Sequence, residues 1–304
     1  MSSLFTKAVK AEAKARIAVT GPSGSGKTYS ALLWATTLAE GGKIAVIDTE
    51  RDSAKLYADR FEFDSLTMSA PYHPNRLIEA LKAAEAEGYA CVVVDSLTHF
   101  YNGQGGLLEL VDQAGAAAKG NSFAGWKVAT PIQQQMVDAI LNFNGHIIAT
   151  MRSKTEWTLE KDERTGRTSP KKVGLAPQQR DGIEYEFTLV VEMDTDHRTI
   201  IGKTRCESLA DKVFPPNKGV DGANEFLTWL KSGDPIITAT QRDVLDSKIR
   251  QLTPEQREVL KGLWAEGNFP KVANLPESRY EEADALLNKI AKTKAKVSAE
   301  VVPE

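Results

Sequence analysis

The sequence predicts an α/β protein with a mostly parallel β-sheet between helices, an added β-hairpin and a small C-terminal helical domain. Short β-branched apolar runs alternate with helical stretches, which is typical of a parallel sheet covered on both faces. Two further strands, separated by a short polar link, follow this alternation and indicate the hairpin. The length of 304 residues favours one large domain plus a small one, because single hydrophobic cores stop growing near ~250–300 residues.

The apolar runs give the expected core strands, at 16–20, 43–47, 91–94 and 146–150. Helical periodicity places helices between and after them, at roughly 27–40, 74–87, 104–118 and 130–143. The hairpin strands are expected at 184–193 and 198–204, joined by the link 194–197. These elements order the chain as strand, helix, strand through its first half, and they place the hairpin at one edge of the sheet.

Three later segments have different patterns. The polar segment 152–182 is rich in Lys, Arg, Gly, Thr and Pro, and we expect a structureless functional or disordered loop there. Prolines and glycines at 215–235 indicate a linker region around one short helix. From Thr238 the pattern is helical, with helix starts at Thr253 and near Pro276. This last part is too short for a large core and is interpreted as a small helical domain.

Charge and composition are those of an ordinary globular protein. The chain has 38 Lys and Arg against 41 Asp and Glu, a net charge of −3, and 41% hydrophobic residues. This excludes a disordered chain, a fibrous repeat and a strongly basic nucleic-acid coat. Cys91 and Cys206 lie far apart, which predicts reduced thiols. No signal peptide and no apolar run near the ~20 residues of a membrane span are seen, so we expect a cytoplasmic protein without a membrane partner.

A glycine-rich motif follows the first predicted strand and opens a helix. It matches the P-loop pattern G-x-x-x-x-G-K-[ST]. The motif consists of Gly21, Pro22, Ser23, Gly24, Ser25, Gly26, Lys27 and Thr28. The glycines let backbone N–H groups face phosphate oxygens, and the helix N-terminus adds partial positive charge. Lys27 is expected to reach the β and γ phosphates of ATP, and the Thr28 hydroxyl to ligate Mg²⁺. Tyr29, directly after the motif, is included in the predicted nucleotide site.

Two acidic strand ends complete the predicted site. Asp95 ends the apolar strand that begins at Cys91, and with the P-loop it predicts a Mg²⁺ ligand, with Ser96 beside it. Glu50 follows the second strand and is the candidate for orienting and polarising the attacking water. The alternative for Glu50 is a solvated carboxylate at a strand end.

The segments 46–57 and 92–96 resemble the second-strand and Walker B segments of RecA-type recombinases. This resemblance implies that Glu50 is the catalytic carboxylate and that Tyr57 stacks on adenine. Ala54 departs from the bacterial recombinase, which has Leu there. Lys203 and Arg205 resemble the basic pair with which recombinases reach a neighbour's ATP, so they are candidate trans-acting cations. Exposed charges that protect an edge strand are the alternative for this pair.

The segments 148–154 and 174–187 are similar to a narrower group, the phage AAA/RecA-like ATPases that include single-strand annealing proteins. The resemblance covers roughly 14–230. It implies a RecA-like P-loop NTPase core, a role in phage recombination and a location in the host bacterial cytoplasm. The predicted boundaries are an N-terminal tail at 1–14, a RecA-like ATPase domain at 15–232, a small helical domain at 238–293 and a disordered tail at 294–304.

In recombinases the loop after the fourth core strand binds single-stranded DNA, and here the corresponding segment is 152–180. It carries eight basic and four acidic residues, a sum of +4 against −7 for the rest of the chain. Basic side chains with an aromatic platform are what sequence-tolerant single-strand binding requires. The candidate DNA-binding residues are Arg152, Lys154, Trp157, Arg164, Arg167, Lys171 and Lys172. Two alternatives remain: a solvated loop whose Trp packs on the core, and an Arg152 that senses the γ-phosphate.

The resemblance also suggests partners. The segment 5–8, Phe-Thr-Lys-Ala, resembles the F-x-x-A segment with which some recombinases dock onto the next subunit, and we expect self-association as a ring or short filament. The C-terminal helices are a candidate site for a single-strand-binding protein, while Trp264 and Phe269 are expected to pack that domain. The leading hypothesis is thus a Mg²⁺-dependent ATPase that binds single-stranded DNA. A nucleotide-dependent loader or regulatory ATPase without DNA contact, and a small-molecule P-loop kinase, are the alternatives.

Overall fold

The computed structural model describes the backbone of residues 10–161, 168–216 and 218–292, and their side chains except at 155–175. These residues form two compact units. One is Lys14–Thr228, and the other joins residues 10–13 to the chain after Thr228. The expected docking segment at 5–8 and the expected tail at 294–304 lie outside the described residues.

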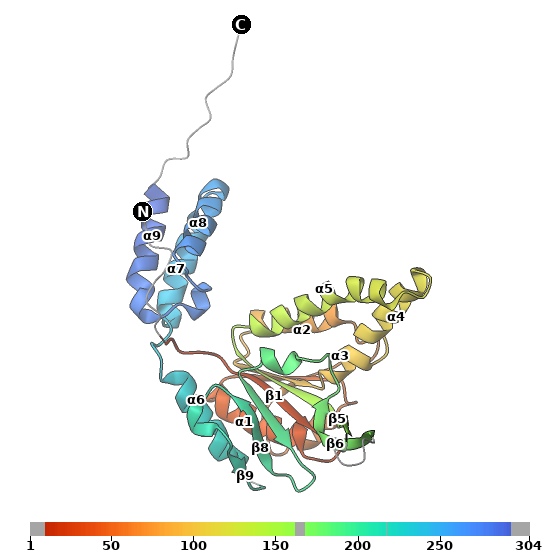
Figure 1. The fold of residues 1–304 in the computed structure, drawn as a ribbon. Coiled ribbons are helices and arrows are strands. Elements are labelled where there is room, and N and C mark those ends of the chain that lie inside the picture. Colours follow the sequence, from red (N-terminus) through yellow and green to blue (C-terminus); the bar gives the residue numbers. More distant parts are fainter. Residues whose placement is uncertain (1–9, 162–167, 217, 293–304) are drawn as a thin grey trace. The chain divides into compact units, whose positions relative to one another are not determined.

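The larger unit is built around one mixed sheet (Figure 1) with the strand order β3-β2-β4-β5-β1-β7-β8-β9, and β6 pairs with β5. The strands are β1 (Arg16–Gly21), β2 (Ile44–Asp48), β3 (Asp64–Thr67), β4 (Cys91–Asp95), β5 (His146–Lys161), β6 (Thr168–Pro177), β7 (Leu189–Met193), β8 (Thr199–Thr204) and β9 (Val213–Phe214). All pairings among β1, β2, β3, β4, β5 and β7 are parallel. The predicted mostly parallel sheet is confirmed, and its carboxyl ends meet at one edge.

Helices cover both faces of this sheet (Figure 1). They are α1 (Lys27–Ala39), α2 (Pro74–Ala86), α3 (Thr98–Asn102), α4 (Leu107–Ala117), α5 (Ser122–Leu141) and α6 (Gly219–Lys231). Leu77 of α2 and Met136 of α5 pack with Val92 and Ile147 in one buried cluster. On the other face, Trp34 of α1 lies against Phe226 of α6, with ring centroids 6.4 Å apart.

Two expected helices differ in their bounds. The helix expected at 104–118 is α4, which begins at Leu107 because a turn at 103–106, with Gly105 at φ 74°, separates it from the short helix α3 that was not expected. The helix expected at 130–143 begins earlier, at Ser122. The side chain of Asn121 caps this helix by accepting hydrogen bonds from the backbone N–H groups of its first turn, and Pro131 stays inside it.

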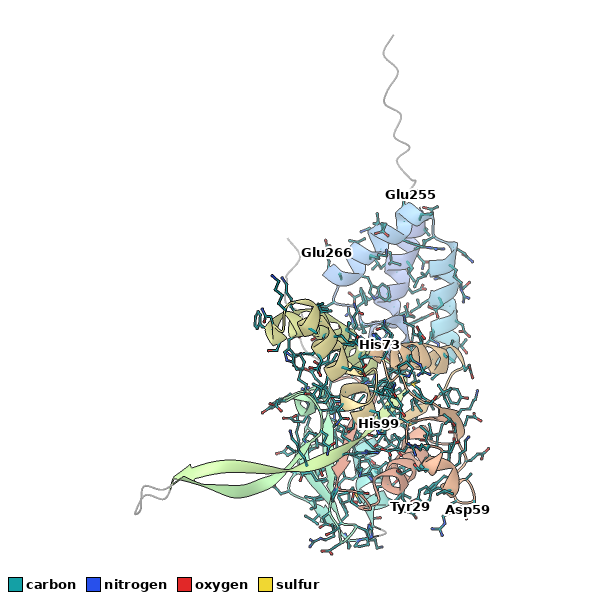
Figure 2. All side chains as sticks on the ribbon, turned by 90° about the vertical axis from the view of Figure 1, so that its right-hand side faces the viewer. Tyr29, Asp59, His73, His99, Glu255 and Glu266 are labelled. Carbon is teal, nitrogen blue, oxygen red and sulfur yellow. The ribbon has the colours of Figure 1, made fainter. Side chains whose placement is uncertain are left out.

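Of the hairpins β5–β6 and β7–β8, only the second was predicted. β7 and β8 pair antiparallel across the link 194–197, as expected. β7 starts at Leu189 rather than 184, because Ile183–Glu186 forms a 3₁₀ turn. The structureless loop expected at 152–182 is wrong: β5 continues to Lys161 and pairs antiparallel with β6, with a register shift between Glu156 and Trp157. Figure 2 shows this hairpin projecting from the sheet as a long two-stranded ribbon.

The C-terminal unit contains α7 (Ala239–Gln251), α8 (Pro254–Glu266) and α9 (Tyr280–Lys292) around a small core that includes Leu245, Leu260 and Leu287. α7 and α8 each begin with a Thr–Gln capping box, at Thr238 and Thr253. Trp264 and Phe269 pack against each other and against this core, as predicted. Within the described part of the chain, no helix is both long and apolar enough to cross a membrane.

Candidate nucleotide site

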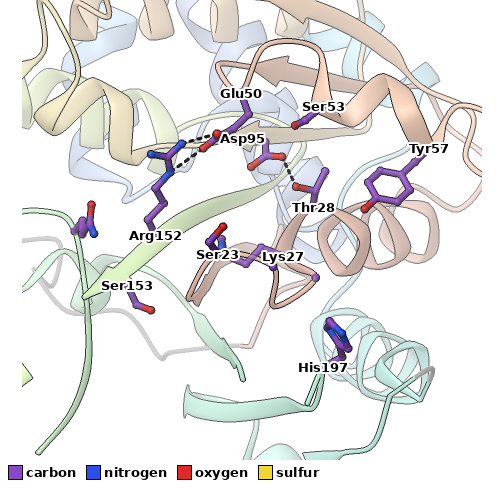
Figure 3. Close-up of a pocket in the computed structure, with 13 residues that line it drawn as sticks. Ser23, Lys27, Thr28, Glu50, Ser53, Tyr57, Asp95, Arg152, Ser153 and His197 are labelled. Carbon is purple, nitrogen blue, oxygen red and sulfur yellow. Dashed lines mark hydrogen bonds and ion pairs between the residues drawn. The ribbon is translucent and has the colours of Figure 1, made fainter. Parts of the chain in front are cut away.

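A cavity of about 700 Å³ lies at the carboxyl edge of the sheet (Figure 3). It is lined by Ser23, Gly24, Gly26, Lys27, Thr28, Glu50, Ser53, Tyr57, Asp95, Arg152, Ser153, Gln178 and His197. The parallel pairing of β1, β2, β4 and β5 brings the loops after these strands together, which is why residues so distant in sequence share one site. Gly21, Pro22, Ser25 and Tyr29, also predicted as nucleotide contacts, do not line the cavity.

The P-loop has the shape of an anion cradle. A Cβ on Gly21 would lie 2.6 Å from the carbonyl oxygen of Met193, so only glycine fits there. Gly26 adopts φ 91° and is the N-cap of α1, which has neither a side-chain cap nor an acidic residue in its first turn. The first N–H groups of α1 are therefore available to phosphate oxygens.

Lys27 extends back over its own loop. Its Nζ donates to the carbonyl oxygens of Gly21 (3.0 Å) and Pro22 (2.7 Å). Burial lowers the pKa of Lys27, while the nearby carboxylates of Asp95 and Glu50 act in the opposite direction. An ammonium group has three N–H donors, so within the described residues one remains for a phosphate oxygen.

Thr28 and Asp95 form the predicted metal side of the site. The Thr28 Oγ1 donates to Asp95 Oδ2 at 2.7 Å, and Thr150 Oγ1 donates to Asp95 Oδ1 at 2.5 Å. Burial raises the pKa of the Asp95 carboxyl, and these two hydrogen bonds act against that rise. In the described residues no group of three or more His, Cys, Asp or Glu side chains could hold a metal ion. The donor set fits Mg²⁺, which is bound through one or two protein oxygens plus phosphates.

A buried carboxylate fixes the turn that carries Glu50. Asp48 is fully buried, and its two oxygens accept hydrogen bonds from the backbone N–H groups of Glu50 (2.6 Å) and Ala54 (3.0 Å). The Thr49 hydroxyl lies 2.7 Å from His99 Nδ1. Burial lowers the pKa of His99, and the nearby Glu50 carboxylate raises it. Both ends of the turn are thus tied down next to the cavity.

Glu50 forms a two-point ion pair with Arg152. Arg152 Nε lies 3.0 Å from Glu50 Oε1, and its second nitrogen lies 2.5 Å from Oε2. The Arg152 side chain is 45% exposed and the Glu50 side chain 25% exposed, so solvent can reach the pair (Figure 3). Arg152, predicted as a DNA contact with a γ-phosphate sensor as the alternative, lines the nucleotide cavity at the base of the hairpin.

Tyr57 stands at the other end of the cavity. Its ring meets Tyr29 edge to face at 5.8 Å, and Tyr29 meets Phe61 in the same way at 5.3 Å. Tyr29 therefore supports Tyr57 from behind, which accounts for its absence from the cavity wall. A ring held in this way can offer a face to a flat base.

Lys203 and Arg205 lie on or beside β8 and outside the cavity lining. Lys203 Nζ donates to three carbonyl oxygens, of Glu184, Tyr185 and Phe187, each at 2.9 Å. Burial lowers the pKa of Lys203, and the neighbouring Arg205 lowers it further. The Arg205 side chain is exposed. Within this chain the two cations differ, since Lys203 is occupied by backbone oxygens and Arg205 faces solvent.

Four of the other predicted DNA-binding residues lie on the β5–β6 hairpin: Lys154, Trp157, Lys171 and Lys172. Lys154 is exposed at the start of the projecting part. The backbone register places Trp157 opposite Lys172 and Thr158 opposite Lys171, so these residues share one stretch of the hairpin. Arg164 and Arg167 lie outside the described residues.

A family model described as an AAA domain matches residues 13–250. The chain belongs to the AAA domain family. Among solved structures, 122 chains match; one is the crystal structure of the RadB recombinase, 19% identical with a TM-score of 0.33, where the match covers 63% of this chain and 83% of that chain. No curated protein matches the sequence. As an AAA domain protein with this P-loop, the chain is a nucleotide-binding P-loop ATPase.

Several residues of the AAA domain site were missed by sequence reasoning: Asp48, Ser53, Thr150, Ser153, Gln178 and His197. Thr150 had a usable signal, because it ends the predicted strand next to that of Asp95. Asp48 ends the second strand directly before Glu50. Ser153, Gln178 and His197 had no such signal in the sequence. Strand pairing brings them to the cavity, and this pairing cannot be inferred from the polar segments that carry them.

Proposed function

We propose that this AAA domain protein is a Mg²⁺-dependent ATPase that binds single-stranded DNA and acts in phage recombination, by annealing or strand pairing. One observation carries the proposal. Arg152, at the base of the β5–β6 hairpin, holds the Glu50 carboxylate at the end of the cavity away from Tyr57. The candidate DNA-binding element and the candidate catalytic carboxylate are therefore joined by one ion pair.

The proposed hydrolytic roles use the residues that line the cavity. Glu50 orients a water molecule toward the γ-phosphorus and accepts its proton, while the bond to the oxygen bridging β and γ breaks and ADP leaves. Lys27 and the N–H groups of α1 donate to the phosphate oxygens that gain charge. Thr28 and Asp95 would hold Mg²⁺, which would neutralise phosphate charge. Arg205 is exposed and free to act on a neighbouring subunit's nucleotide.

The proposed coupling works through Arg152. A guanidinium that pairs with Glu50 competes with the water that Glu50 must orient, so hydrolysis requires the pair to open. Binding of single-stranded DNA along the basic hairpin shifts Arg152 toward the nucleic acid or the γ-phosphate. The expected result is an ATPase that single-stranded DNA stimulates.

The test is ATP turnover with Mg²⁺, with and without a mixed-sequence single-stranded oligonucleotide, followed by an annealing assay on complementary strands. Lys27→Ala should abolish ATP binding and defines the background. Lys171→Glu/Lys172→Glu should weaken DNA binding and flatten its salt dependence. The matched control is Lys43→Glu/Lys82→Glu, which makes the same charge change at two exposed lysines outside the hairpin.

Each alternative has its own outcome in this experiment. Turnover that DNA leaves unchanged, together with no DNA binding, contradicts the proposal and favours a loader or regulatory ATPase. Transfer of the γ-phosphate to a small acceptor instead of release as inorganic phosphate favours a kinase. Equal DNA binding by the hairpin variant and its control removes the hairpin from the DNA interface.

A further inference from the structure

His197 lies over the P-loop although it comes from the turn between β7 and β8. β7 pairs in parallel with β1, so this turn follows its strand at the same edge of the sheet as the P-loop. His197 lines the cavity, and its Nδ1 lies 3.4 Å from the position that a Cβ on Gly26 would occupy. The imidazole therefore packs directly against the last glycine before Lys27.

The turn holds His197 in place without help from a ligand. Asp194 Oδ1 accepts hydrogen bonds from the backbone N–H groups of Asp196 (3.0 Å) and Arg198 (2.9 Å). Arg198 Nε also donates to Asp194 Oδ2 at 2.6 Å. The hydrogen bond from the Arg198 backbone contributes most to the lowered pKa of Asp194. This network sets the left-handed backbone of His197, at φ 60°.

The imidazole of His197 is available to a ligand. It is exposed, and it makes no hydrogen bond or ion pair to any residue that the structure describes. Histidine is one of the non-glycine residues that adopt positive φ most readily, so the turn can hold this conformation at low cost. Here the enforced conformation presents a flat, polar ring to a cavity wall.

The layout of the cavity indicates which part of a nucleotide the ring meets. Figure 3 shows Tyr57 and His197 on one side of Lys27 and Thr28, and Arg152 on the other. Glu50 and Arg152 mark the γ-phosphate end. Because the phosphates run along the P-loop, the ribose and base emerge at the end where Tyr57 and His197 stand.

We propose that His197 is a nucleotide-contact residue whose imidazole packs against the ribose and base, on the wall across from Tyr57. The inference rests on nucleotide binding and is independent of any DNA function. His197 contributes to affinity and not to the bond-breaking step, so its loss raises KM and leaves kcat unchanged.

The variant His197→Asn tests this contact, because Asn adopts the left-handed backbone that the turn requires and removes the ring. Binding of ATP and of inorganic tripolyphosphate, each with Mg²⁺, is measured by titration calorimetry. ATP affinity should fall about tenfold, the order of one lost stacking contact, and tripolyphosphate affinity should stay unchanged. Thr195→Ala, at an exposed position of the same turn outside the cavity, should leave both affinities unchanged. Equal loss of both ligands, or no loss of either, overturns the proposal.

A second measurement uses the unmodified protein and so does not depend on how the variant folds. The chain has four histidines, and diethyl pyrocarbonate labelling of each is read by peptide mass spectrometry. ATP should protect His197, and tripolyphosphate should not. His73, whose Nδ1 accepts from Asn75 N outside the cavity, is the internal reference. Labelling of His197 that ATP does not reduce contradicts the contact.

Discussion

Two β-hairpins flank the P-loop strand, and they reach the nucleotide cavity by different means. In the first hairpin, β5–β6, strand β5 pairs with β1 on one side, and the cavity is lined by Arg152, Ser153 and Gln178 from this hairpin. In the second, β7–β8, strand β7 pairs with β1 on the other side, and His197 lines the cavity. At its base, the first hairpin is linked to Glu50 by a half-exposed ion pair, whereas backbone hydrogen bonds fix the turn of the second. The ion pair joins side chains of two separate elements, whereas the hydrogen bonds of the turn are all local.

This difference suggests separate tasks for the two hairpins. The first has a contact with the candidate catalytic carboxylate that can be made and broken, which suits an element that reports DNA binding. In the proposed arrangement the second forms a fixed wall at the nucleoside end. The comparison predicts that substitutions at the first hairpin change turnover, and that substitutions at the second change stability or affinity.

The largest expected effect comes from Glu50→Gln. The amide cannot act as a base, so kcat should fall about 10²–10⁴-fold, while ATP affinity stays within about threefold of that of the unmodified protein. Steady-state turnover and nucleotide titration measure the two quantities. Glu62→Gln, at an exposed residue outside the cavity, is the matched control. Normal turnover in Glu50→Gln would contradict the proposed catalytic role of Glu50. It would also contradict control of turnover by the first hairpin, which acts through Glu50.

Arg152→Lys tests the ion pair more finely. Lysine keeps the charge but cannot form the two parallel hydrogen bonds to Glu50. If the pair restrains Glu50 in the absence of DNA, basal turnover should rise and stimulation by single-stranded DNA should shrink, each by about twofold to tenfold, or up to about 1.4 kcal/mol. Turnover assays with and without DNA give both ratios. Unchanged ratios would mean that the pair does not couple the hairpin to hydrolysis.

Sequence patterns predicted the parts of the site that depend on local chain order. The P-loop, Glu50 and Asp95 each follow a strand that is apolar enough to recognise, so their positions follow from strand, loop and helix in sequence. The β7–β8 hairpin was also predictable, because its strands carry buried residues on either side of a short polar link.

The remaining parts depend on contacts that cannot be seen along the chain. The β5–β6 hairpin reads as a polar loop because its sequence is rich in Lys, Arg, Gly, Thr and Pro. Pairing between distant residues such as Ser153 and Pro177 creates it. Asp48 looks like one more acid at a strand end, yet its burial and two backbone hydrogen bonds appear only after the turn folds over it. The position of His197 at the cavity could be known only from the register of β7 against β1.

A matched pair of variants at the end of β8 separates structural from intermolecular roles in the second hairpin. Lys203→Ala leaves three carbonyl oxygens without their shared donor, so unfolding free energy should fall by about 1–3 kcal/mol. Arg205→Ala removes an exposed side chain and should change it by less than about 0.5 kcal/mol. Urea unfolding measures both. If Arg205 acts on a neighbour's ATP, its variant also loses the dependence of specific turnover on protein concentration. Equal stability of the two variants would contradict a structural role for the three hydrogen bonds of Lys203.

The smallest expected effect concerns Lys154, which is exposed two residues beyond Arg152 on β5. If it contacts a DNA phosphate, Lys154→Ala should reduce the slope of log affinity against log salt by about one unit. It should leave ATP affinity unchanged, because Lys154 does not line the cavity. Fluorescence anisotropy with a labelled oligonucleotide between 50 and 200 mM salt, roughly the range over which such slopes are resolved, measures the slope. An unchanged slope would move the DNA path off this part of the hairpin and leave Arg152 as a residue of the nucleotide site alone.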